Sequence, residues 1–490
     1  MANKVIFSEE NINLLFGQLA AEDEDFSKLQ AYYIKNKTHD KVTANLPLRI
    51  LVGHKGIGKS AIFTIARHED LEANRLSILI RPDDIANLGT ASNFSEMIRD
   101  WKEGLISIVL SKIFSFVDIS ATDILSRASQ IGGKIMGLMV ETFSNKIRNF
   151  GDTNPSARLI IEQFLKEHRI IVYIDDLDRG WESHKHDIQR ISALLNAVRD
   201  LCNDNKGLQF RISLRTDVYY LVRTADESTD KIANSVIWHS WTNHEILLLL
   251  IKRIENFWNR KIDIESLRSR KQYQIAYLLD SIFEKRFNGN GKWANAPMYK
   301  ILMSLIRKRP RDLVLLCTLA AKEAYDKNAN LISTEHFEAI FPEYSQGRIQ
   351  DTTNEYKSEL PDIERLLLNM KPSQKEIREH VGYIYDSNRL KRKIRTIMER
   401  GQFRYANGRI ADESSLLQFM YKINFLTARK ELDDGTIERK YFEENKYLSS
   451  QVVDFGYNWE IHPAFRWALK PDNVYSCLLY TSPSPRDGAT

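Results

Sequence analysis

Cysteine, net charge and long apolar runs are all scarce in this sequence of 490 residues. Its three cysteines are too few for a disulfide framework, and Cys202 and Cys317 lie inside helix-like apolar patterns, so buried thiols in a reduced, cytoplasmic protein are expected. The formal net charge of +5 is small for this length, so nucleic-acid binding would require a local basic patch. The most apolar runs, residues 104–117 and 246–251, are too short or are interrupted by Lys112, which predicts no membrane span.

Signal peptides, internal repeats and low-complexity blocks are also not visible. Glu9 and Glu10 stand where a signal peptide would carry its apolar core. A composition of 43% hydrophobic and 28% charged residues is that of an ordinary globular protein. The string CLLYTSPSPRD, Cys477 to Asp487, resembles the translation of a sequencing-library adapter. We therefore interpret residues 477–490 as an artefact and leave them out of the fold argument, and the natural C-terminus is then unknown.

The stretch LRILVGHKGIGKSAI, residues 48–62, has the spacing Gly53-x-x-x-x-Gly58-Lys59-Ser60 between a strand-like and a helix-like segment. Glycines at these positions allow successive N–H groups to turn inward and form an anion nest at a helix N-terminus. Lys59 is then expected at the β- and γ-phosphates and Ser60 at Mg²⁺, whereas the alternative is a glycine-rich turn that binds nothing. The predicted nucleotide-binding residues are Gly53, His54, Lys55, Gly56, Ile57, Gly58, Lys59, Ser60 and Ala61.

A second motif, IDDLDR, follows the apolar run 170–174. Such a run predicts a central parallel strand, and carboxylates at its C-terminal end face the crevice where ligands bind in open α/β sheets. Asp175 is predicted to hold Mg²⁺ through water, and Asp176 to polarise the attacking water as a general base. The alternative is a buried strand that ends in a solvated acidic turn.

Two arginines complete the predicted catalytic set of Lys59, Asp176, Arg215 and Arg311. The strand 208–214 should lie between the strands that carry the phosphate loop and Asp175, which would bring Arg215 to the γ-phosphate. Arg311, in RPRDL, begins a helix in a region that would cover the nucleotide. For each arginine the alternative is a surface side chain capped by a nearby acid. Arg179 is either an arginine finger toward a neighbouring subunit or the ion-pair partner of Asp178.

Apolar strands alternate with helical patterns in the first half of the chain, which predicts an α/β domain with a mostly parallel sheet covered on both faces. The strands are expected at residues 48–52, 76–81, 170–174, 208–214 and 235–238, and helices include residues 92–117 and 191–201. We assign residues 1–245 to this core with an N-terminal extension, residues 246–345 to a helical lid and residues 356–472 to a small α+β domain, after a polar connector near 345–356. Residues 118–155 are either an insertion or a surface helix pair.

The small C-terminal domain is predicted to be winged-helix-like, because helices precede a hairpin with the turn Asp433-Asp434-Gly435. One of its helices carries the basic residues Arg389, Lys391, Arg392, Lys393 and Arg395. These either contact nucleic-acid phosphates or form a solvated or protein-binding face, and the acidic residues that flank them favour the second. His184 and His186 have no ligand partners at metal-site spacing and are interpreted as loop residues.

Taken together, the strand with its phosphate loop, IDDLDR, the arginine after the fourth strand and RPRDL resemble the AAA+/STAND branch of P-loop ATPases. IDDLDR most resembles the KAP-type ATPases. The likeness to one bacterial family also includes Phe16-Gly17, the acidic segment 21–24 and the pair Trp238 and Trp241, and it covers most of residues 1–470.

The resemblance implies a P-loop NTPase fold and ATP with Mg²⁺ as cofactors. Hydrolysis is expected to be slow, because aspartate stands at Asp176 where glutamate is usual. The resemblance implies that the protein is a molecular switch in bacterial signalling or antiphage defence. Whether it acts as a homo-oligomer or with a protein partner is left open. The alternative is an ATP-regulated DNA-binding protein that uses the C-terminal domain, and a small-molecule phosphotransferase ranks last.

Overall fold

The computed structural model describes residues 5–73, 75–117, 169–290, 293–373, 375–376, 382–433, 437–445 and 456–470. The chain forms two compact units. The sheet unit comprises Lys35–Lys55 and Lys59–His239, and the helical unit comprises Met1–Ile34, Gly56–Gly58 and Ser240–Thr490. The domain boundaries expected near residues 245, 345 and 356 stay predictions. The segment 118–155 and the interpretation of residues 477–490 lie outside the described residues.

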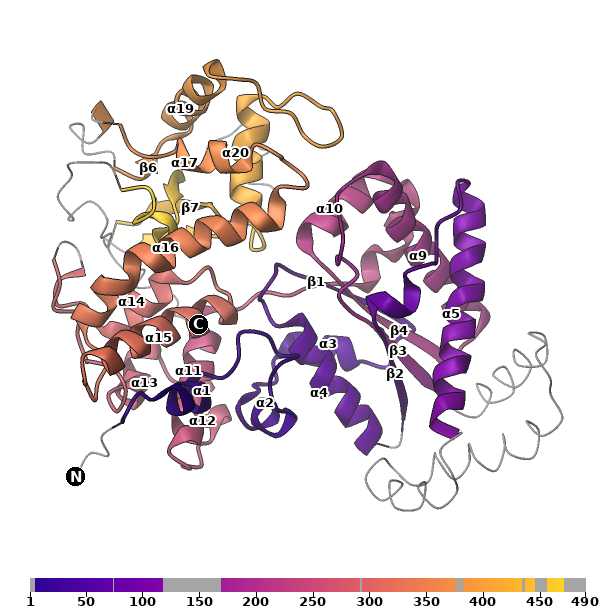
Figure 1. The fold of residues 1–490 in the computed structure, drawn as a ribbon, viewed down its shortest axis with the longest axis horizontal. Helices are drawn as coiled ribbons and strands as arrows, with labels where there is room; N and C mark the ends of the chain where they lie inside the picture. Colours follow the sequence, from indigo (N-terminus) through magenta and orange to yellow (C-terminus); the bar gives the residue numbers. More distant parts are fainter. Residues whose placement is uncertain are drawn as a thin grey trace. The chain divides into compact units, whose positions relative to one another are not determined.

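Five parallel strands form the centre of the sheet unit, in the order β2, β3, β4, β1, β5 (Figure 1). Their bounds are β1 Leu48–Val52, β2 Leu76–Ile80, β3 Ile170–Ile174, β4 Leu208–Leu214 and β5 Val236–Trp238. The seven residues of β4 lie between β1 and β3, as predicted, and every residue of β3 and β4 is buried. The predicted α/β fold with a parallel sheet is confirmed.

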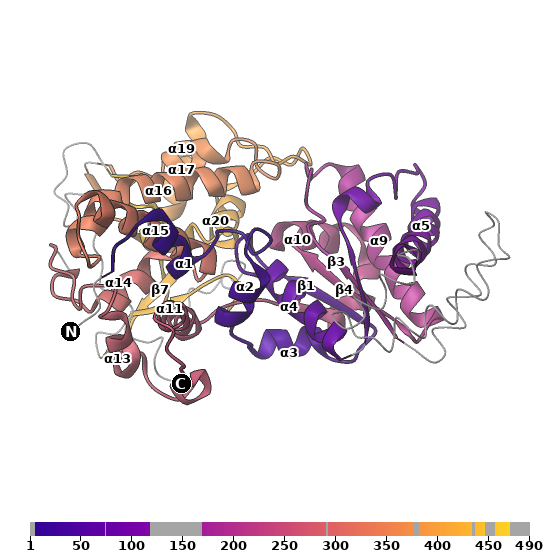
Figure 2. The ribbon, with the colours of Figure 1, turned by 60° about the horizontal axis from the view of Figure 1, so that its bottom comes forward.

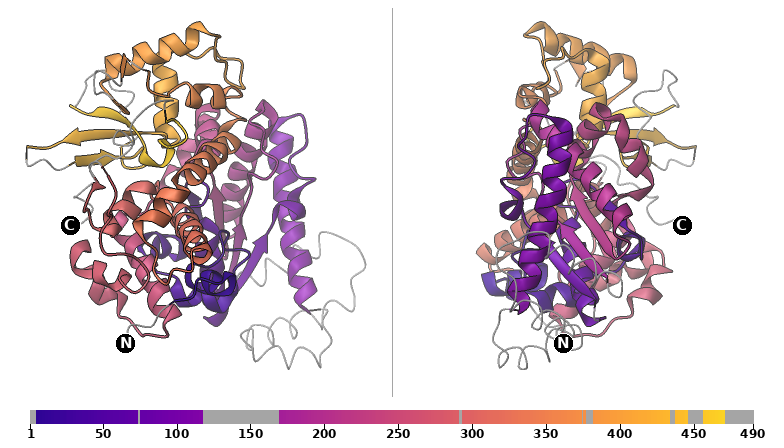
Figure 3. Two further views of the ribbon diagram at one scale, coloured as in Figure 1. Left: turned by 60° about the vertical axis from the view of Figure 1, so that its left-hand side comes forward. Right: turned by 90° about the vertical axis from the view of Figure 1, so that its right-hand side faces the viewer.

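Helices cover both faces of this sheet. The elements are α3 Lys37–Thr43, α4 Lys59–Glu72, η1 Pro82–Ile85, α5 Phe94–Val117, α9 Lys185–Asp204, α10 Thr216–Ala225 and η2 Glu227–Ser235. Figure 1 shows α3 and α4 on one side of the sheet and α5, α9 and α10 on the other, and the right-hand view of Figure 3 shows α5 running along the sheet. The wholly buried Trp101 fixes α5 to α9, because its indole N–H donates to the Arg190 carbonyl at 3.0 Å.

The helical unit combines helices that precede the sheet unit in the sequence, α1 and α2, with those that follow it, from α11 onward (Figure 2). Its helices are α1 Glu9–Phe16, α2 Phe26–Tyr32, α11 Asn243–Phe257, α12 Ile264–Arg268, α13 Gln272–Ile275, η3 Ala276–Leu279, α14 Met298–Leu305, α15 Pro310–Asp326, α16 Thr334–Tyr356, α17 Ile363–Leu368, α19 Ser387–Glu399, α20 Glu413–Lys422 and η5 Pro463–Phe465. Helix α1 packs on α11 and α15, and α2 packs on α11. None of the helices in the described part of the chain has the length and apolar character that a membrane crossing requires.

The structure explains why glycine stands at position 17 in the Phe16-Gly17 motif. Gly17 has a φ of 70°, and a Cβ there would lie 2.4 Å from Glu24 Oε2. That oxygen accepts a hydrogen bond from the Gln18 backbone N–H at 2.7 Å and another from the Tyr32 hydroxyl. The guanidinium of the buried Arg253 lies over the Tyr32 ring, 4.1 Å from its centroid. The acidic segment thus joins α1 and α2 to α11.

A second sheet, of four strands, lies within the helical unit in the order β6, β9, β7, β8, and the left-hand view of Figure 3 shows it in yellow beside α20. Its strands are β6 Ile384–Tyr385, β7 Leu426–Glu431, β8 Ile437–Lys440 and β9 Asn458–Ile461. The predicted hairpin is present as the antiparallel pair of β7 and β8, whereas turn residues 434–436 lie outside the described residues. Sequence patterns did not indicate that β9 pairs with both β6 and β7.

The polar stretch 345–356, predicted as a connector, is instead the second half of helix α16. Several of its polar side chains are buried and bonded: Ser345 Oγ accepts from the Ala468 N–H at 2.9 Å, and Thr352 Oγ1 accepts from Arg307 at 2.9 Å. The prediction was wrong because polar composition was taken as a sign of solvent exposure. Here these groups are the partners of other buried polar groups.

A buried ionic cluster joins the beginning of α15 to α16. Both carboxylate oxygens of Asp312 accept from the Arg307 guanidinium, at 2.8 and 3.0 Å, and Oδ1 also accepts from Arg348 at 2.6 Å. Arg309 pairs with Glu355 at 3.1 Å. Although burial opposes it, the charges of Arg307 and Arg348 hold the pKa of the Asp312 carboxyl well below its usual range. Buried charges persist only when paired and hydrogen-bonded in this way.

The two cysteines of the described residues are buried thiols, as predicted. Cys202 lies at the end of α9 and donates to the Pro47 carbonyl at 3.4 Å, and burial raises the pKa of its thiol to about 12. Burial also raises the pKa of the Cys317 thiol in α15. Both thiols therefore stay protonated and unreactive at neutral pH.

We expect Asp312→Asn to destabilise the helical unit by about 3–5 kcal/mol, because two buried guanidinium groups lose their counter-charge. Since the folded-state pKa is depressed, this stabilisation is present above about pH 4 and is lost as the pH falls below that value. The difference between wild type and variant in the urea midpoint should therefore shrink on acidification. As a control, Asp351→Asn removes an acid that is 55% exposed and pairs with the same Arg348, and it should cost about 1 kcal/mol or less. Equal losses in both variants would contradict the role given to Asp312.

Candidate nucleotide site

The phosphate loop connects β1 directly to α4, as the sequence predicts. The Gly53 N–H donates to the Leu214 carbonyl at 3.2 Å, so the beginning of the loop continues the pairing of β1 with β4. Gly56 and Gly58 have φ values of 76° and 99°, a region that residues with a Cβ avoid. The glycine spacing is thus required by the backbone path, with a helix N-terminus immediately after it.

Lys59 lies folded over its own loop. Its Nζ donates to the Gly53 carbonyl at 3.0 Å and to the His54 carbonyl at 3.3 Å. His54 itself is 1% exposed, so the first half of the loop is part of the core. The ammonium group is consequently held at the loop, where a phosphate bound in the nest would meet it.

The middle of the loop, residues 56–58, belongs to the helical unit. The Arg311 backbone N–H donates to the Gly56 carbonyl at 3.3 Å, and the indole N–H of the buried Trp241 donates to the Ile57 carbonyl at 2.7 Å. A Cβ on Gly56 would lie 2.8 Å from the Arg311 Cβ. The loop therefore fits closely against the first residues of α15 and against Trp241.

Asp175 and Asp176 follow β3 at the same edge of the sheet as the phosphate loop, because all five strands are parallel. Asp175 Oδ1 accepts from the Ser213 hydroxyl and from the Asp176 backbone N–H, the latter at 2.9 Å. Asp176 is exposed and has a φ of 59°. The two residues thus differ: Asp175 is anchored to the neighbouring strand, and Asp176 is the more exposed of the two.

Arg215 lies between β4 and α10 as the N-cap residue of that helix, with 9% of its surface exposed. Its guanidinium pairs with Asp217 through two hydrogen bonds, at 3.0 and 2.7 Å, and with Asp178 at 3.2 Å. Asp178 therefore pairs with Arg215, and Arg179 is exposed. The alternatives for Arg215 were a γ-phosphate contact and a surface arginine capped by an acid. In the structure Arg215 is bound to acids, as in the second alternative, but it is buried.

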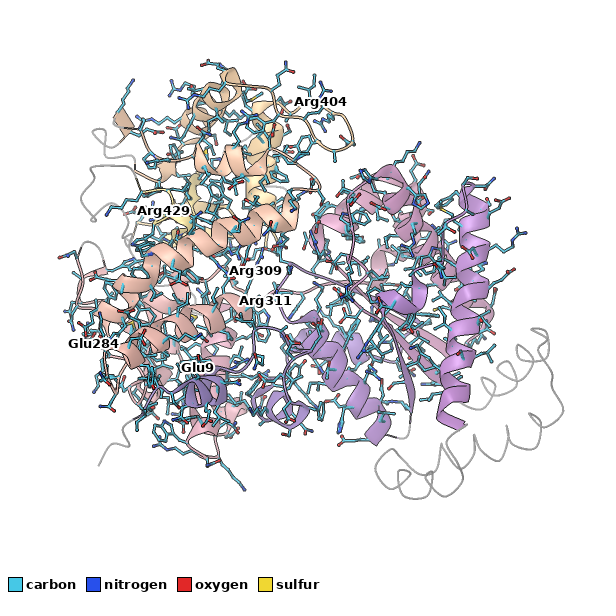
Figure 4. The ribbon with its side chains drawn as sticks, viewed as in Figure 1. Glu9, Glu284, Arg309, Arg311, Arg404 and Arg429 are labelled. Carbon is cyan, nitrogen blue, oxygen red and sulfur yellow. The ribbon has the colours of Figure 1, made fainter. Side chains whose placement is uncertain are left out.

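Arg311 begins helix α15 as expected, one residue after Pro310. Its side-chain Nε donates to the Leu19 carbonyl in the segment that joins α1 to α2, at 3.0 Å. Figure 4 shows Arg309 and Arg311 together at this helix start. Arg311 thus contacts the phosphate loop through its backbone and the N-terminal segment through its side chain.

The basic run of α19 is largely neutralised. Lys393 pairs with Glu376 at 2.6 Å, Arg395 pairs with Glu413 at 2.7 Å and Arg389 pairs with Asp386 at 3.3 Å. Arg389 and Arg395 are exposed, as are Lys391 and Arg392. In the next helix, α20, Phe419 is buried and packs against Tyr356 of α16. These contacts favour the interpretation of the run as a solvated or protein-binding face.

Sequence reasoning did not assign a role to Ser213 or Trp241, although each touches a predicted site element. Ser213 is one of three polar residues in β4, with Gln209 and Arg211, and that pattern alone does not identify a carboxylate partner. Trp241 was noted only as part of a family resemblance. Its hydrogen bond joins residues 184 apart in sequence, which no local pattern indicates.

No protein-family model matches the sequence. A curated relative, the putative transposon gamma-delta 80.3 kDa protein of Escherichia coli strain K12, is 22% identical over 485 residues, covering 88% of this chain. The chain spans 65% of the length of that relative.

Among solved structures, the chain is similar to Aeropyrum pernix ORC2 in its ADPNP-ADP complexes (10% identity, 81% of this chain and 84% of the other, TM-score 0.36). It is also similar to Cdc6p of Pyrobaculum aerophilum (11%, 92% and 93%, TM-score 0.31) and to Drosophila ORC bound to DNA (10%, 90% and 92%, TM-score 0.33). Because these TM-scores are below 0.5, we base no argument on them.

We expect Gly56→Ala to weaken nucleotide binding by at least tenfold and to lower the thermal midpoint, because the new Cβ meets both an unfavourable φ and the Arg311 side chain. Gly408→Ala is a matched control, since Gly408 has a φ of 85° and open space around its Cβ position. This control should lower stability by about 1–2 kcal/mol and leave binding unchanged. Calorimetric titration with Mg²⁺-ATP and thermal unfolding measure the two effects. Wild-type affinity in Gly56→Ala would contradict the close fit described for the loop.

Proposed function

We propose that the protein is a Mg²⁺-dependent ATPase of the AAA+ type that acts as a molecular switch. The observation that carries this proposal is the common sheet edge at which the phosphate loop after β1 and the paired carboxylates after β3 both lie, with β4 between them. A bound triphosphate requires both parts, an anion nest with a cation and a site for the metal and the attacking water.

The phosphates are held by the loop 53–61, where backbone N–H groups, the N-terminus of α4 and the Lys59 ammonium supply positive charge. Mg²⁺ is held by the Ser60 hydroxyl and, through water, by Asp175. These are hard oxygen ligands of the kind that Mg²⁺ prefers. The hydrogen bonds from Ser213 and the Asp176 N–H to Asp175 Oδ1 support this role, because they orient the carboxylate.

Asp176 serves as the general base. It is the exposed member of the pair, so its carboxylate can reach a water molecule, and its φ of 59° is a conformation that is rare for residues with a Cβ and more frequent for Asp. Strained backbone of this kind is concentrated at functional sites. Arg215 reaches the γ-phosphate only if it exchanges a bond to Asp178 or Asp217 for one to the nucleotide, which would make it responsive to the nucleotide state.

The switch runs through the beginning of α15. Arg311 touches the loop, Arg309 pairs with Glu355 of α16, and Lys308 pairs at 2.6 Å with Glu444, which follows β8. A change of the loop on hydrolysis would therefore act on a short, paired segment that also contacts the winged-helix-like C-terminal part. A role in bacterial signalling or antiphage defence, as a homo-oligomer or with a protein partner, follows from the family resemblance.

We expect Asp176→Asn to bind Mg²⁺-ATP normally and to hydrolyse it about a hundredfold or more slowly, the usual scale for the loss of a positioned base. Asp175→Asn should instead raise the Mg²⁺ concentration needed for half-maximal turnover, since a group that orients the metal's water shell is lost. Single-turnover kinetics with both variants distinguishes the two roles. Lys59→Ala, which removes the loop cation, is the control that should lose tight binding. Equal hydrolysis rates in Asp176→Asn and wild type would show that this carboxylate is not the base.

The alternative, an ATP-regulated DNA-binding protein, would use the basic run of α19, in which Arg389, Lys391, Arg392 and Arg395 are exposed. We expect Lys391→Gln combined with Arg392→Gln to leave ATP turnover intact, with or without duplex DNA, at every salt concentration. Lys322→Gln with Lys327→Gln is a control of equal charge change on α15 and its C-cap. DNA stimulation that fades with rising salt and disappears only in the α19 double variant would support the alternative instead.

A further inference from the structure

Two successive carbonyl groups in the phosphate loop are each held by a donor of the helical unit. The Gly56 carbonyl accepts from the Arg311 backbone N–H at 3.3 Å, and the Ile57 carbonyl accepts from the Trp241 indole N–H at 2.7 Å. The second bond is the shorter one, and both Trp241 and Ile57 are buried, at 7% and 3% exposure. Water therefore does not compete for this carbonyl.

Because peptide groups are planar, these two bonds also fix the directions of the N–H groups that follow each carbonyl. In a trans peptide the C=O of one residue and the N–H of the next point in opposite directions, and rotation about the bond is strongly hindered. The described chain has no cis peptide bond. Because the Ile57 carbonyl is directed to Trp241, the Gly58 N–H is directed away from it, and by the same argument the Ile57 N–H is directed away from the Arg311 N–H. Each of these two adjacent N–H groups thus points away from the donor that holds the preceding carbonyl.

We propose that Trp241 is a positioning residue for the phosphate nest: its indole N–H fixes the peptide between Ile57 and Gly58 so that the Gly58 N–H is presented to the phosphate before the nucleotide binds. This rests on the proposed function, in which the loop binds ATP. Without the indole donor the peptide can rotate, because Gly58 has no Cβ and a substituent there would have open space. The nest would then have to be ordered at the cost of binding free energy.

Trp241 itself is held rigidly. It directly precedes Thr242, the N-cap of α11, where a capping box is complete: Thr242 Oγ1 accepts from the Glu245 N–H at 3.1 Å, and Glu245 Oε2 accepts from the Thr242 N–H at 2.9 Å. Two residues before Trp241, the His239 N–H donates to the Val52 carbonyl at 2.8 Å, at the end of β1. The capping box fixes the backbone that directly follows Trp241, which is what an orienting donor requires.

The test compares Trp241→Phe with Trp238→Phe. Trp238 is a matched control, since it lies three residues earlier and packs by ring contacts on Tyr219 and Tyr220, at 5.5 and 5.7 Å. We expect Trp241→Phe to raise both the Kd for Mg²⁺-ATP and the KM about 5- to 30-fold, with kcat nearly unchanged, because a nest N–H binds the ground and transition states alike. Trp238→Phe should leave the Kd and KM at wild-type values.

A second variant removes only the donor. Benzothienylalanine incorporated at position 241 keeps the bicyclic shape and replaces N–H by sulfur, so it separates the hydrogen bond from packing even if Trp241→Phe folds poorly. The same 5- to 30-fold loss of affinity with an unchanged thermal midpoint is the expected result. Wild-type affinity in this analogue would overturn the inference and leave the proposed ATPase intact. A wild-type protein that binds no Mg²⁺-ATP would overturn the proposed function and the inference with it.

Discussion

The position of β4 between β1 and β3 is the constraint on which the candidate site depends. A parallel strand can enter the middle of a sheet only if both of its edges find hydrogen-bond partners and both of its faces are covered, and all seven residues of β4 are buried. The strand separates the phosphate loop from the carboxylates by one strand width. It also supplies Ser213 to Asp175 and Arg215 to the same edge. The site is therefore a consequence of strand order more than of any one motif.

Much of this arrangement could be predicted from local sequence, and for physical reasons. The strands 48–52 and 170–174 are apolar runs that only a covered parallel sheet accommodates, and the glycines of the loop mark backbone angles that other residues avoid. The helix beginning at Pro310 was indicated by proline at its first position. These signals depend on neighbours in sequence, so one sequence is enough to read them.

What could not be predicted depends on pairing over long sequence separations. The stretch 345–356 is polar and yet has a buried side, where Arg348 and Thr352 bind residues near position 310. The cations of α19 form a run in sequence, but three of the five have acidic partners, one of them, Glu413, on α20. Strand β9 joins β6 to β7 from beyond residue 456. In each case the sequence identifies the chemical type of the side chain or strand, but it does not identify the distant residue that pairs with it.

Neither compact unit is a continuous piece of the chain. Helices α1 and α2 belong to the helical unit but precede the whole sheet unit, and their partners α11 and α15 begin more than 200 residues later. During synthesis the apolar side chains of Ile12, Leu15 and Phe16, all buried in the finished structure, leave the ribosome before their partner helices α11 and α15 have been made. Closing so long a loop costs entropy before its contacts form. Helices α1 and α2 therefore have to wait for α11 and α15 before they can reach their final places, and no truncation at a single position yields either unit intact.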